Sequence, residues 1–181
     1  MKIHTTPIPD VWVIEPQVFS DSRGYFFESY HRDKFKQLGI NANFIQDNES
    51  LSHKNIVRGL HFQAPPYAQG KLVRVAQGKV YDVCVDIRKN SPTYGKYFGI
   101  ELSAENHLML WIPEGFAHGF SVLEDNTLFL YKCTNIYHRG TEGGILWNDP
   151  TLGIDWKVDN PIVSEKDKQL PTFDAFISPF E

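Results

Sequence analysis

Hydrophobic and polar residues alternate along the middle of this chain, and the alternation predicts a β-rich protein. Between residues 56 and 133, runs with the two-residue period of a strand cover residues 73–75, 80–87, 98–102, 108–112, 116–123 and 127–133. Residues typical of turns separate the runs, at 77–78, 90–92, 113–115 and 124–126. Short strands at this spacing are typical of an antiparallel sandwich or barrel.

The segments on either side of this region are less regular. Residues 11–14 form a short apolar run close to Pro7, Pro9 and Pro16, and prolines at this distance favour an edge strand. A turn at 21–24 precedes a predicted strand at 25–30, a short helix is expected at 32–38, and residues 44–50 begin apolar and end polar. A last helical turn is expected at 164–170. We therefore expect one domain over residues 1–181, with an N-terminal arm of about residues 1–20 and a loop-rich tail of about residues 144–181.

Composition narrows the classes of function. The chain has 181 residues, of which 41% are hydrophobic, and this argues against disorder. Its net charge of −4 gives no support to general nucleic-acid binding, so any bound anion needs a local basic cluster. No apolar run approaches the ~20 residues of a membrane helix, and the first residues lack the apolar core of a signal peptide. Cys84 and Cys133 do not make a disulfide framework, so we expect reduced cysteines, no membrane partner and a cytoplasmic location.

Residues 58–63, Arg-Gly-Leu-His-Phe-Gln, carry the densest group of chemically useful side chains. Leu60 and Phe62 alternate with His61 and Gln63, as on a half-buried strand. Arg58 does not fall on the face of His61 in strict register, but Gly59 between them tolerates a bulge that would reconcile the two.

Further basic residues follow downstream, at Lys71, Arg74 and His118. Together with residues 58–63 they predict a fixed cationic site that contains a general base. The alternative is a strand whose polar side chains are only solvated.

Residues 113–118 fit the Pro-x-Gly-x-x-His pattern of the second cupin motif, which belongs to double-sheet jelly-roll barrels. The first cupin motif supplies two His and a Glu as metal ligands, but here Gln63 follows His61, and Lys71 stands seven residues before Gly78 where the Glu would be. An ammonium opposes a divalent cation. The site therefore resembles a cupin barrel in which Lys71 replaces the metal as the positive charge, and we expect no metal. Alternatively, residues 113–115 are only a hairpin turn.

Four segments together resemble one family closely. They are Gln-Asp-Asn at 46–48, residues 58–63, Tyr-Lys-Cys-Thr-Asn at 131–135 and Ser-Glu-Lys-Asp at 164–167, and they resemble the signatures of the dTDP-4-dehydrorhamnose 3,5-epimerases. The resemblance runs from about residue 3 to residue 175. It implies a mainly β fold, a cupin-like jelly-roll (double-stranded β-helix) barrel with short peripheral helices, no cofactor, and a homodimer. We expect residues 1–20 to contribute a strand or arm to the partner.

The reaction of that family sets chemical demands on the site. Its substrate, dTDP-4-keto-6-deoxy-D-glucose, has a ketone at carbon 4 that acidifies the protons on carbons 3 and 5. Inversion to dTDP-4-keto-L-rhamnose, on the route to dTDP-L-rhamnose, needs a base, an acid on the opposite face and a cation near the enolate oxygen. By resemblance, His61 is the base, Asp167 orients it, Tyr131 is the acid and Lys71 steadies the enolate. From the residues alone, Asp167 also fits a capping box with Ser164, and Tyr131 an ordinary strand tyrosine.

The resemblance also assigns residues to substrate binding, namely Arg23, Glu28, Gln46, Asp47, Asn48, Arg58, Lys71, His118 and Glu142. The two arginines suit a pyrophosphate because a guanidinium presents a bidentate fork, although Arg23 also fits a plain surface charge. Whether Phe26 and Tyr137 stack nearby is left open. Three other functions stay open at this point: an epimerase acting at one carbon only, a metal-dependent cupin oxygenase, and a sugar-nucleotide binding module without activity.

Overall fold

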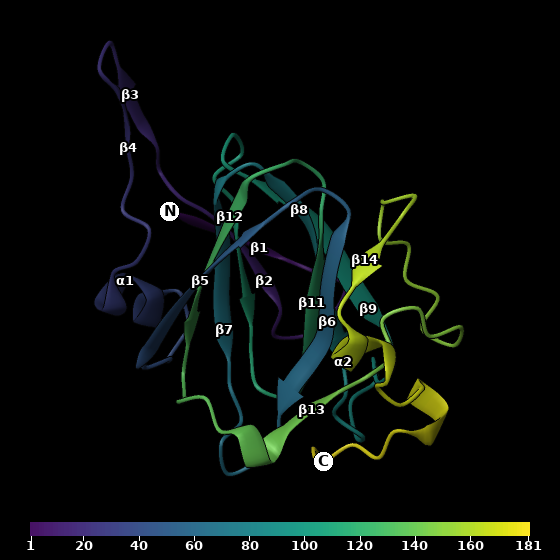
Figure 1. The fold of residues 1–181 in the computed structure, drawn as a ribbon. Coiled ribbons are helices and arrows are strands. Elements are labelled where there is room, and N and C mark those ends of the chain that lie inside the picture. Colours follow the sequence, from purple (N-terminus) through teal and green to yellow (C-terminus); the bar gives the residue numbers. More distant parts are fainter.

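Two six-stranded sheets face each other in the computed structural model, which describes residues 1–181 (Figure 1). The β7 sheet has the order β1 (Lys2–Thr5), β2 (Trp12–Glu15), β10 (Met109–Ile112), β7 (Lys71–Gln77), β12 (Thr127–Cys133) and β5 (Gln46–Ser52). The β6 sheet has the order β13 (Glu142–Gly144), β6 (Ile56–Gln63), β11 (Phe116–Val122), β8 (Lys79–Asp86) and β9 (Tyr97–Ser103). Its sixth strand, β14 (Ile162–Val163), pairs with β6 in parallel, and all other pairs are antiparallel. The predicted mainly β, jelly-roll class is confirmed.

Apolar side chains form three layers, because both sheets are covered on their outer faces as well. Between the sheets lies a cluster that includes Val73, Phe120 and Phe129. The tail after β13 covers the outer face of the β6 sheet, where Leu60 and Trp156 belong to the second cluster. The helix α1 (Arg32–Gln37) covers the β7 sheet through Phe35. No helix in the chain is long and apolar enough to cross a membrane.

The N-terminal residues join the β7 sheet of their own chain. The prediction of an edge strand at residues 11–14 is wrong, because β2 pairs with β1 on one side and with β10 on the other. Pro7, Pro9 and Pro16 lie just outside β2, so they remove no hydrogen-bond donor from the ladder. On this side of the sheet the edge strand is β1.

A narrow hairpin follows and projects away from the sandwich (Figure 1). It consists of β3 (Phe19–Asp21) and β4 (Gly24–Phe26) around the predicted turn, and the strand expected at 25–30 ends at Phe26. Three aromatic side chains on it, Phe19, Tyr25 and Phe26, are 58%, 57% and 70% exposed. The hairpin therefore presents apolar surface that its own chain leaves uncovered.

The predicted bulge at Gly59 is confirmed. His118 of β11 is opposite His61, and Phe120 is opposite Arg58, so β6 has one residue more than β11 over this stretch. Gly59 has φ +135, and a Cβ there would lie 2.6 Å from Gly119 Cα. Because of this extra residue, Arg58 and His61 line the same cavity.

The remaining helices are short. A 3₁₀ turn, η1 (Arg139–Thr141), precedes β13, and another, η2 (Phe173–Ala175), lies in the tail. Between β14 and η2 stands α2 (Glu165–Lys168), which begins after Ser164 as predicted.

Candidate active site

A cavity with two lobes opens between the sheets. The Arg58 lobe has a volume of about 480 Å³ and is also lined by His118, Lys166 and Asp167. The Tyr137 lobe has a volume of about 380 Å³ and is lined by polar residues that include Gln46, Asn48, Gln63 and Glu142. Three side chains line both lobes, and they are His61, Lys71 and Tyr131. Three of the four residues expected to carry the chemistry therefore meet where the lobes join, and the fourth, Asp167, lines the Arg58 lobe.

The side chains of His61 and Asp167 form a tight pair. His61 Nε2 donates to Asp167 Oδ1 at 2.7 Å, and the Gly59 N–H donates to Asp167 Oδ2 at 3.3 Å. Burial works to raise the pKa of Asp167, but the bonds from His61, Gly59 and Ser164 outweigh it and hold that pKa below its ordinary value. An ionised Asp167 fixes the proton of a neutral His61 on Nε2 and leaves Nδ1 free to accept a proton.

The N-cap of α2 decides between two interpretations of Asp167. Ser164 Oγ accepts from the Asp167 N–H at 3.1 Å, as in a capping box. The Asp167 carboxylate, however, is used by His61 and Gly59 on β6. The cap positions the backbone of Asp167, and its side chain reaches across to the imidazole.

Tyr131 and Lys71 belong to the opposite sheet from His61. Tyr131 on β12 pairs with Asn48 and Val73, and Lys71 on β7 pairs with Cys133. Burial raises the pKa of the Tyr131 phenol, so the hydroxyl keeps its proton near neutral pH, while the charge of Arg58 acts the other way. Burial lowers the pKa of the Lys71 ammonium. The charges of Cys133, Asp82 and Glu142 act in the opposite direction and raise that pKa.

His118 stands next to His61 on the β6 sheet and is held by a buried carboxylate. Its Nε2 lies 3.0 Å from both oxygens of Asp82, which is fully buried on β8. Burial lowers the pKa of His118, although Asp82 works to raise it. A neutral His118 therefore donates through Nε2 to Asp82. Sequence reasoning did not single out Asp82, although it lies on the same face of β8 as Val80 and Cys84, which both belong to the core between the sheets.

Other predicted binding residues surround the same cavity. Arg58 donates through Nε and Nη2 to Ser52 Oγ, at 3.2 and 3.1 Å. Gln46 Nε2 donates to Asn48 Oδ1 at 3.0 Å. Lys166 is a cation that sequence reasoning missed, although it precedes Asp167. Its Nζ lies 2.7 Å from Glu142 Oε2.

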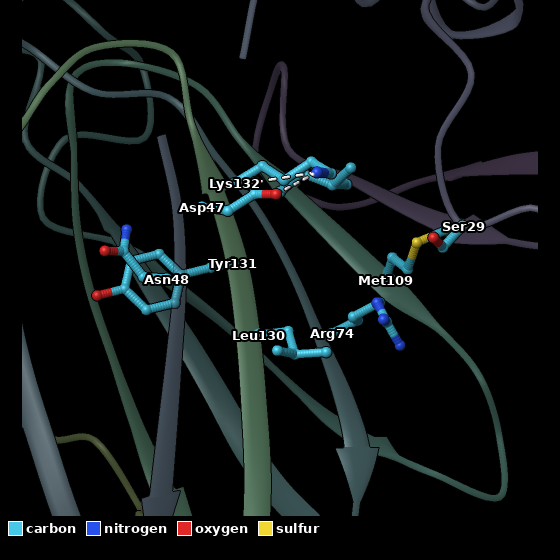
Figure 2. Close-up of a pocket in the computed structure, with 9 residues that line it drawn as sticks. Ser29, Asp47, Asn48, Arg74, Met109, Leu130, Tyr131 and Lys132 are labelled. Carbon is cyan, nitrogen blue, oxygen red and sulfur yellow. Dashed lines mark hydrogen bonds and ion pairs between the residues drawn. The ribbon is translucent and has the colours of Figure 1, made fainter. Parts of the chain in front are cut away.

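Asp47 lies on the opposite face of the β7 sheet from its neighbours Gln46 and Asn48. Its carboxylate pairs with Lys132 Nζ at 2.8 Å, beside a small outer cavity of about 160 Å³ that Arg74 also lines. Figure 2 shows Tyr131 and Asn48 on one side of β12, and Lys132 and Arg74 on the other. Strand alternation separates these residues, so the Arg74 guanidinium is not part of the predicted cationic site.

Arg23 and Glu28 also lie away from the cavity of their own chain. Arg23 is at the tip of the β3–β4 hairpin, where its Nη2 is paired with Asp21 at 2.6 Å and its side chain is 87% exposed. Glu28 follows the hairpin and is paired with Lys34 Nζ at 2.8 Å. Neither residue lines either lobe.

The cupin metal position is occupied by side chains that do not suit a metal. Gln63 and Lys71 line the Tyr137 lobe beside His61. No group of three or more His, Cys, Asp or Glu side chains is gathered so that it could hold a metal ion. The donor set around His61 therefore does not fit the metal centre of a cupin oxygenase.

Comparison with known proteins gives a consistent result over nearly the whole chain. Residues 5–175 match the family model described as dTDP-4-dehydrorhamnose 3,5-epimerase. A protein of that name from Shigella flexneri is 55% identical over 168 residues, which is 92% of this chain and 93% of that protein. The crystal structure of the Elizabethkingia anophelis enzyme of the same name aligns with a TM-score of 0.92 and 50% identity, over 96% of this chain and 97% of that one. The dTDP-6-deoxy-D-glucose-3,5-epimerase of Legionella pneumophila, crystallised with dTDP-4-keto-L-rhamnose, aligns with a TM-score of 0.92 and 45% identity, over 96% and 93% of the two chains.

Proposed function

This chain belongs to the dTDP-4-dehydrorhamnose 3,5-epimerase family, and on that premise we propose how its cavity inverts carbons 3 and 5 of dTDP-4-keto-6-deoxy-D-glucose. The reaction is a step in the biosynthesis of dTDP-L-rhamnose. It needs no change of oxidation state, because each inversion removes one proton and returns one from the other side. The side chains around the junction of the two lobes supply the groups for both transfers.

His61 is the base of the mechanism. With Nε2–H donated to the Asp167 carboxylate at 2.7 Å, the lone pair on Nδ1 takes the proton from carbon 3 or carbon 5. The charge of Asp167 stabilises the imidazolium that results. One base serves both positions because they flank the same ketone, and between the two inversions the imidazolium gives its proton to water while the Tyr131 phenolate takes one from water.

Lys71 and Tyr131 complete the transfer. The Lys71 ammonium, which lines both lobes, stabilises the negative charge that develops on the carbon 4 oxygen. The Tyr131 phenol then donates a proton to the face of the enolate opposite to His61. The observation that carries this proposal is that His61 and Tyr131 line one cavity from opposite sheets.

The decisive experiment is turnover in deuterated water, with product configuration followed by NMR. We expect deuterium at both carbons with the parent protein. His61→Ala is expected to lose exchange at both carbons by at least about 10²–10⁴-fold. Its affinity for dTDP should be nearly unchanged, because the arginines grip the phosphates. Full exchange at either carbon in this variant would refute a single base, and uptake at one carbon in the parent would indicate a single epimerisation.

Substrate binding is assigned to polar residues around the two lobes. Arg58 and Lys166 supply positive charge for the pyrophosphate in the Arg58 lobe. His118 lines that lobe, and Gln46, Asn48 and Glu142 offer hydrogen bonds in the Tyr137 lobe. The side chain of Asp47 faces away, so any part it has in binding runs through its backbone.

A second copy of the chain supplies the remaining two binding residues. Arg23 and Glu28 lie at and beside a hairpin that projects from the sandwich and exposes Phe19, Tyr25 and Phe26. Residues 2–5 and 12–15 pair within their own sheet, so this hairpin is the better candidate for the predicted dimer arm. In the proposed homodimer, the hairpin covers its apolar surface against the partner and brings Arg23 to the partner's cavity.

Mixing two inactive variants tests this sharing of sites. Subunits with His61→Ala and subunits with Arg23→Ala are refolded together in equal amounts. Half of the dimers are then mixed, and each mixed dimer has one intact site, so about a quarter of the parent activity is expected to return. If the hairpin serves its own subunit, no site is intact and no activity returns. A monomeric mass by light scattering at micromolar concentration would also contradict the dimer.

A further inference from the structure

Gln63 has no part in this mechanism, yet its amide is buried and all its hydrogen-bonding groups are used. The side chain is 5% exposed at the end of β6. Its Nε2 donates to the carbonyl oxygens of Tyr67 at 2.7 Å and Ile136 at 3.1 Å, and its Oε1 accepts from the His138 N–H at 2.7 Å. A glutamine has two N–H donors, and both are engaged.

These bonds hold the two peptide groups on either side of Tyr137. The Ile136 carbonyl belongs to the peptide that enters Tyr137, and the His138 N–H belongs to the peptide that leaves it. The Tyr137 N–H donates in turn to Gln46 Oε1 at 2.7 Å. One buried side chain therefore fixes the backbone of Tyr137 from both ends.

The position of Tyr137 depends on such bonds because little else holds it. Its side chain is 53% exposed, and it belongs to none of the three apolar clusters. Its hydroxyl donates to Glu142 Oε2 at 3.0 Å, the same oxygen that pairs with Lys166. These contacts make the ring a wall of the lobe that His61, Lys71 and Tyr131 share.

The third bond of Gln63 extends the same clamp to a second loop. Its Nε2 also holds the Tyr67 carbonyl, and the rings of Tyr67 and His138 are stacked, with centroids 4.0 Å apart and planes 2° from parallel. Gln63 thereby joins the loop before β7 to the loop that carries Tyr137.

We propose that Gln63 is a positioning residue for substrate binding, which clamps the loop carrying Tyr137 so that its ring contacts the bound sugar nucleotide. The side chain stands at the place of a metal-binding histidine in the cupin motif, and here it binds backbone atoms instead. This inference rests on the proposed function, because the ligand of the Tyr137 lobe is the substrate of that reaction. Gln63 acts on affinity through Tyr137 and leaves proton transfer to His61 and Tyr131.

Three variants test the clamp. Gln63→Leu keeps the approximate size and loses all three bonds, and we expect KM to rise about 10–100-fold with kcat within about threefold of the parent. Gln63→Glu keeps the acceptor for the His138 N–H and loses both donors, so we expect a rise in KM smaller than that of Gln63→Leu. This variant also serves as the test if Gln63→Leu does not fold. Asn135→Ala is the matched control. It removes a 3.2 Å bond to the Pro66 carbonyl between the same two loops and a 2.9 Å bond from the Ile136 N–H, so it loosens the same loop without touching Gln63. Its KM is expected within about twofold of the parent.

A double-mutant cycle with Tyr137→Ala separates positioning from a general structural role. If Gln63 acts through Tyr137, adding Gln63→Leu to Tyr137→Ala raises KM by less than about twofold. Effects that multiply in the double variant, or a loss of kcat in place of a rise in KM, would overturn the proposal. So would equal changes of KM in Gln63→Leu and Asn135→Ala.

Calorimetry in an inactive background distinguishes this inference from the proposed function. Substrate binding is compared between His61→Ala and His61→Ala/Gln63→Leu, where a 10–100-fold loss of affinity is expected. If the parent protein binds the substrate without inverting it, the proposed function is refuted. The clamp is still supported in that case, provided that Gln63→Leu lowers the affinity as expected. Equal affinity in the two variants would overturn the clamp, whatever the parent catalyses.

Discussion

Replacing Asp167 with asparagine changes the hydrogen-bonding character of the base without changing its size. The carboxylate now accepts two bonds, from His61 Nε2 at 2.7 Å and from the Gly59 N–H at 3.3 Å. Asparagine has one oxygen to accept with and an NH₂ group that only donates. If its oxygen faces Gly59, its NH₂ faces His61 Nε2, and the ring must then carry its proton on Nδ1, towards the substrate. If it is turned the other way, two donors meet at Gly59.

The size of the effect follows from these two orientations. A buried donor without a partner costs about 1–3 kcal/mol, which favours the orientation that satisfies Gly59. In that orientation Nδ1 has no lone pair for the proton of carbon 3 or carbon 5, and the imidazolium has lost its counter-charge. Loss of a general base lowers rates by about 10²–10⁴, and at about 1.36 kcal/mol per tenfold this raises the barrier by roughly 3–5 kcal/mol.

The assay is kcat/KM for the epimerisation, together with deuterium uptake, for Asp167→Asn and for a control in the same turn. Ser164→Ala removes the 3.1 Å bond to the Asp167 N–H and is expected to destabilise the protein by about 1 kcal/mol, while it keeps the carboxylate. Its kcat/KM should stay within about threefold of the parent. A value for Asp167→Asn within the same range would refute the role of Asp167 as the partner of the base.

Further predictions concern the acid, the cation and the core. Tyr131→Phe should keep deuterium uptake and lose inversion at one or both carbons, since His61 returns the proton to the face it came from; inversion of both carbons at the parent rate would show that Tyr131 is not the acid. Because burial lowers the pKa of Lys71, kcat/KM should fall as pH rises through a value below the 10.5 of a free lysine, and Lys71→Arg should remove this alkaline limb from the pH profile. Phe129, which is 1% exposed between the sheets, should lose about 3–5 kcal/mol of unfolding free energy on substitution by alanine, measured by urea denaturation.

The strands and the turn signals between residues 56 and 133 were predictable because they are local. A period of two residues reports which face of a strand is buried, and Gly59 in an otherwise alternating segment marks the bulge that the structure contains. The short helix before Gly39 was predictable for the same reason, since Gly39 has φ +96 and ends the helix. That β2 lies inside the sheet was not predictable from the sequence. Its partners on β10 are 95 or more residues away, such as Met109 opposite Ile14, and the packing of the whole sheet decides this pairing.

The catalytic roles were assigned by resemblance to the family, because the residues alone were also compatible with structural roles. Nothing in the local sequence relates Asp167 to His61, which are 106 positions apart. The cap of Ser164 on Asp167 was visible in the sequence, but the direction of the carboxylate depends on how the tail packs against β6.

The sequence by itself determined the class of fold, the bulge at Gly59 and the replacement of metal ligands by Gln63 and Lys71. Only the tertiary structure decided which of the predicted residues share a cavity. Asp47 alternates away from Asn48, and Arg23 projects on a hairpin, because side-chain direction depends on the sheet and on the path of the chain. The role of Gln63 as a clamp was equally hidden, since its partners are backbone groups, and every residue type except proline presents the same ones.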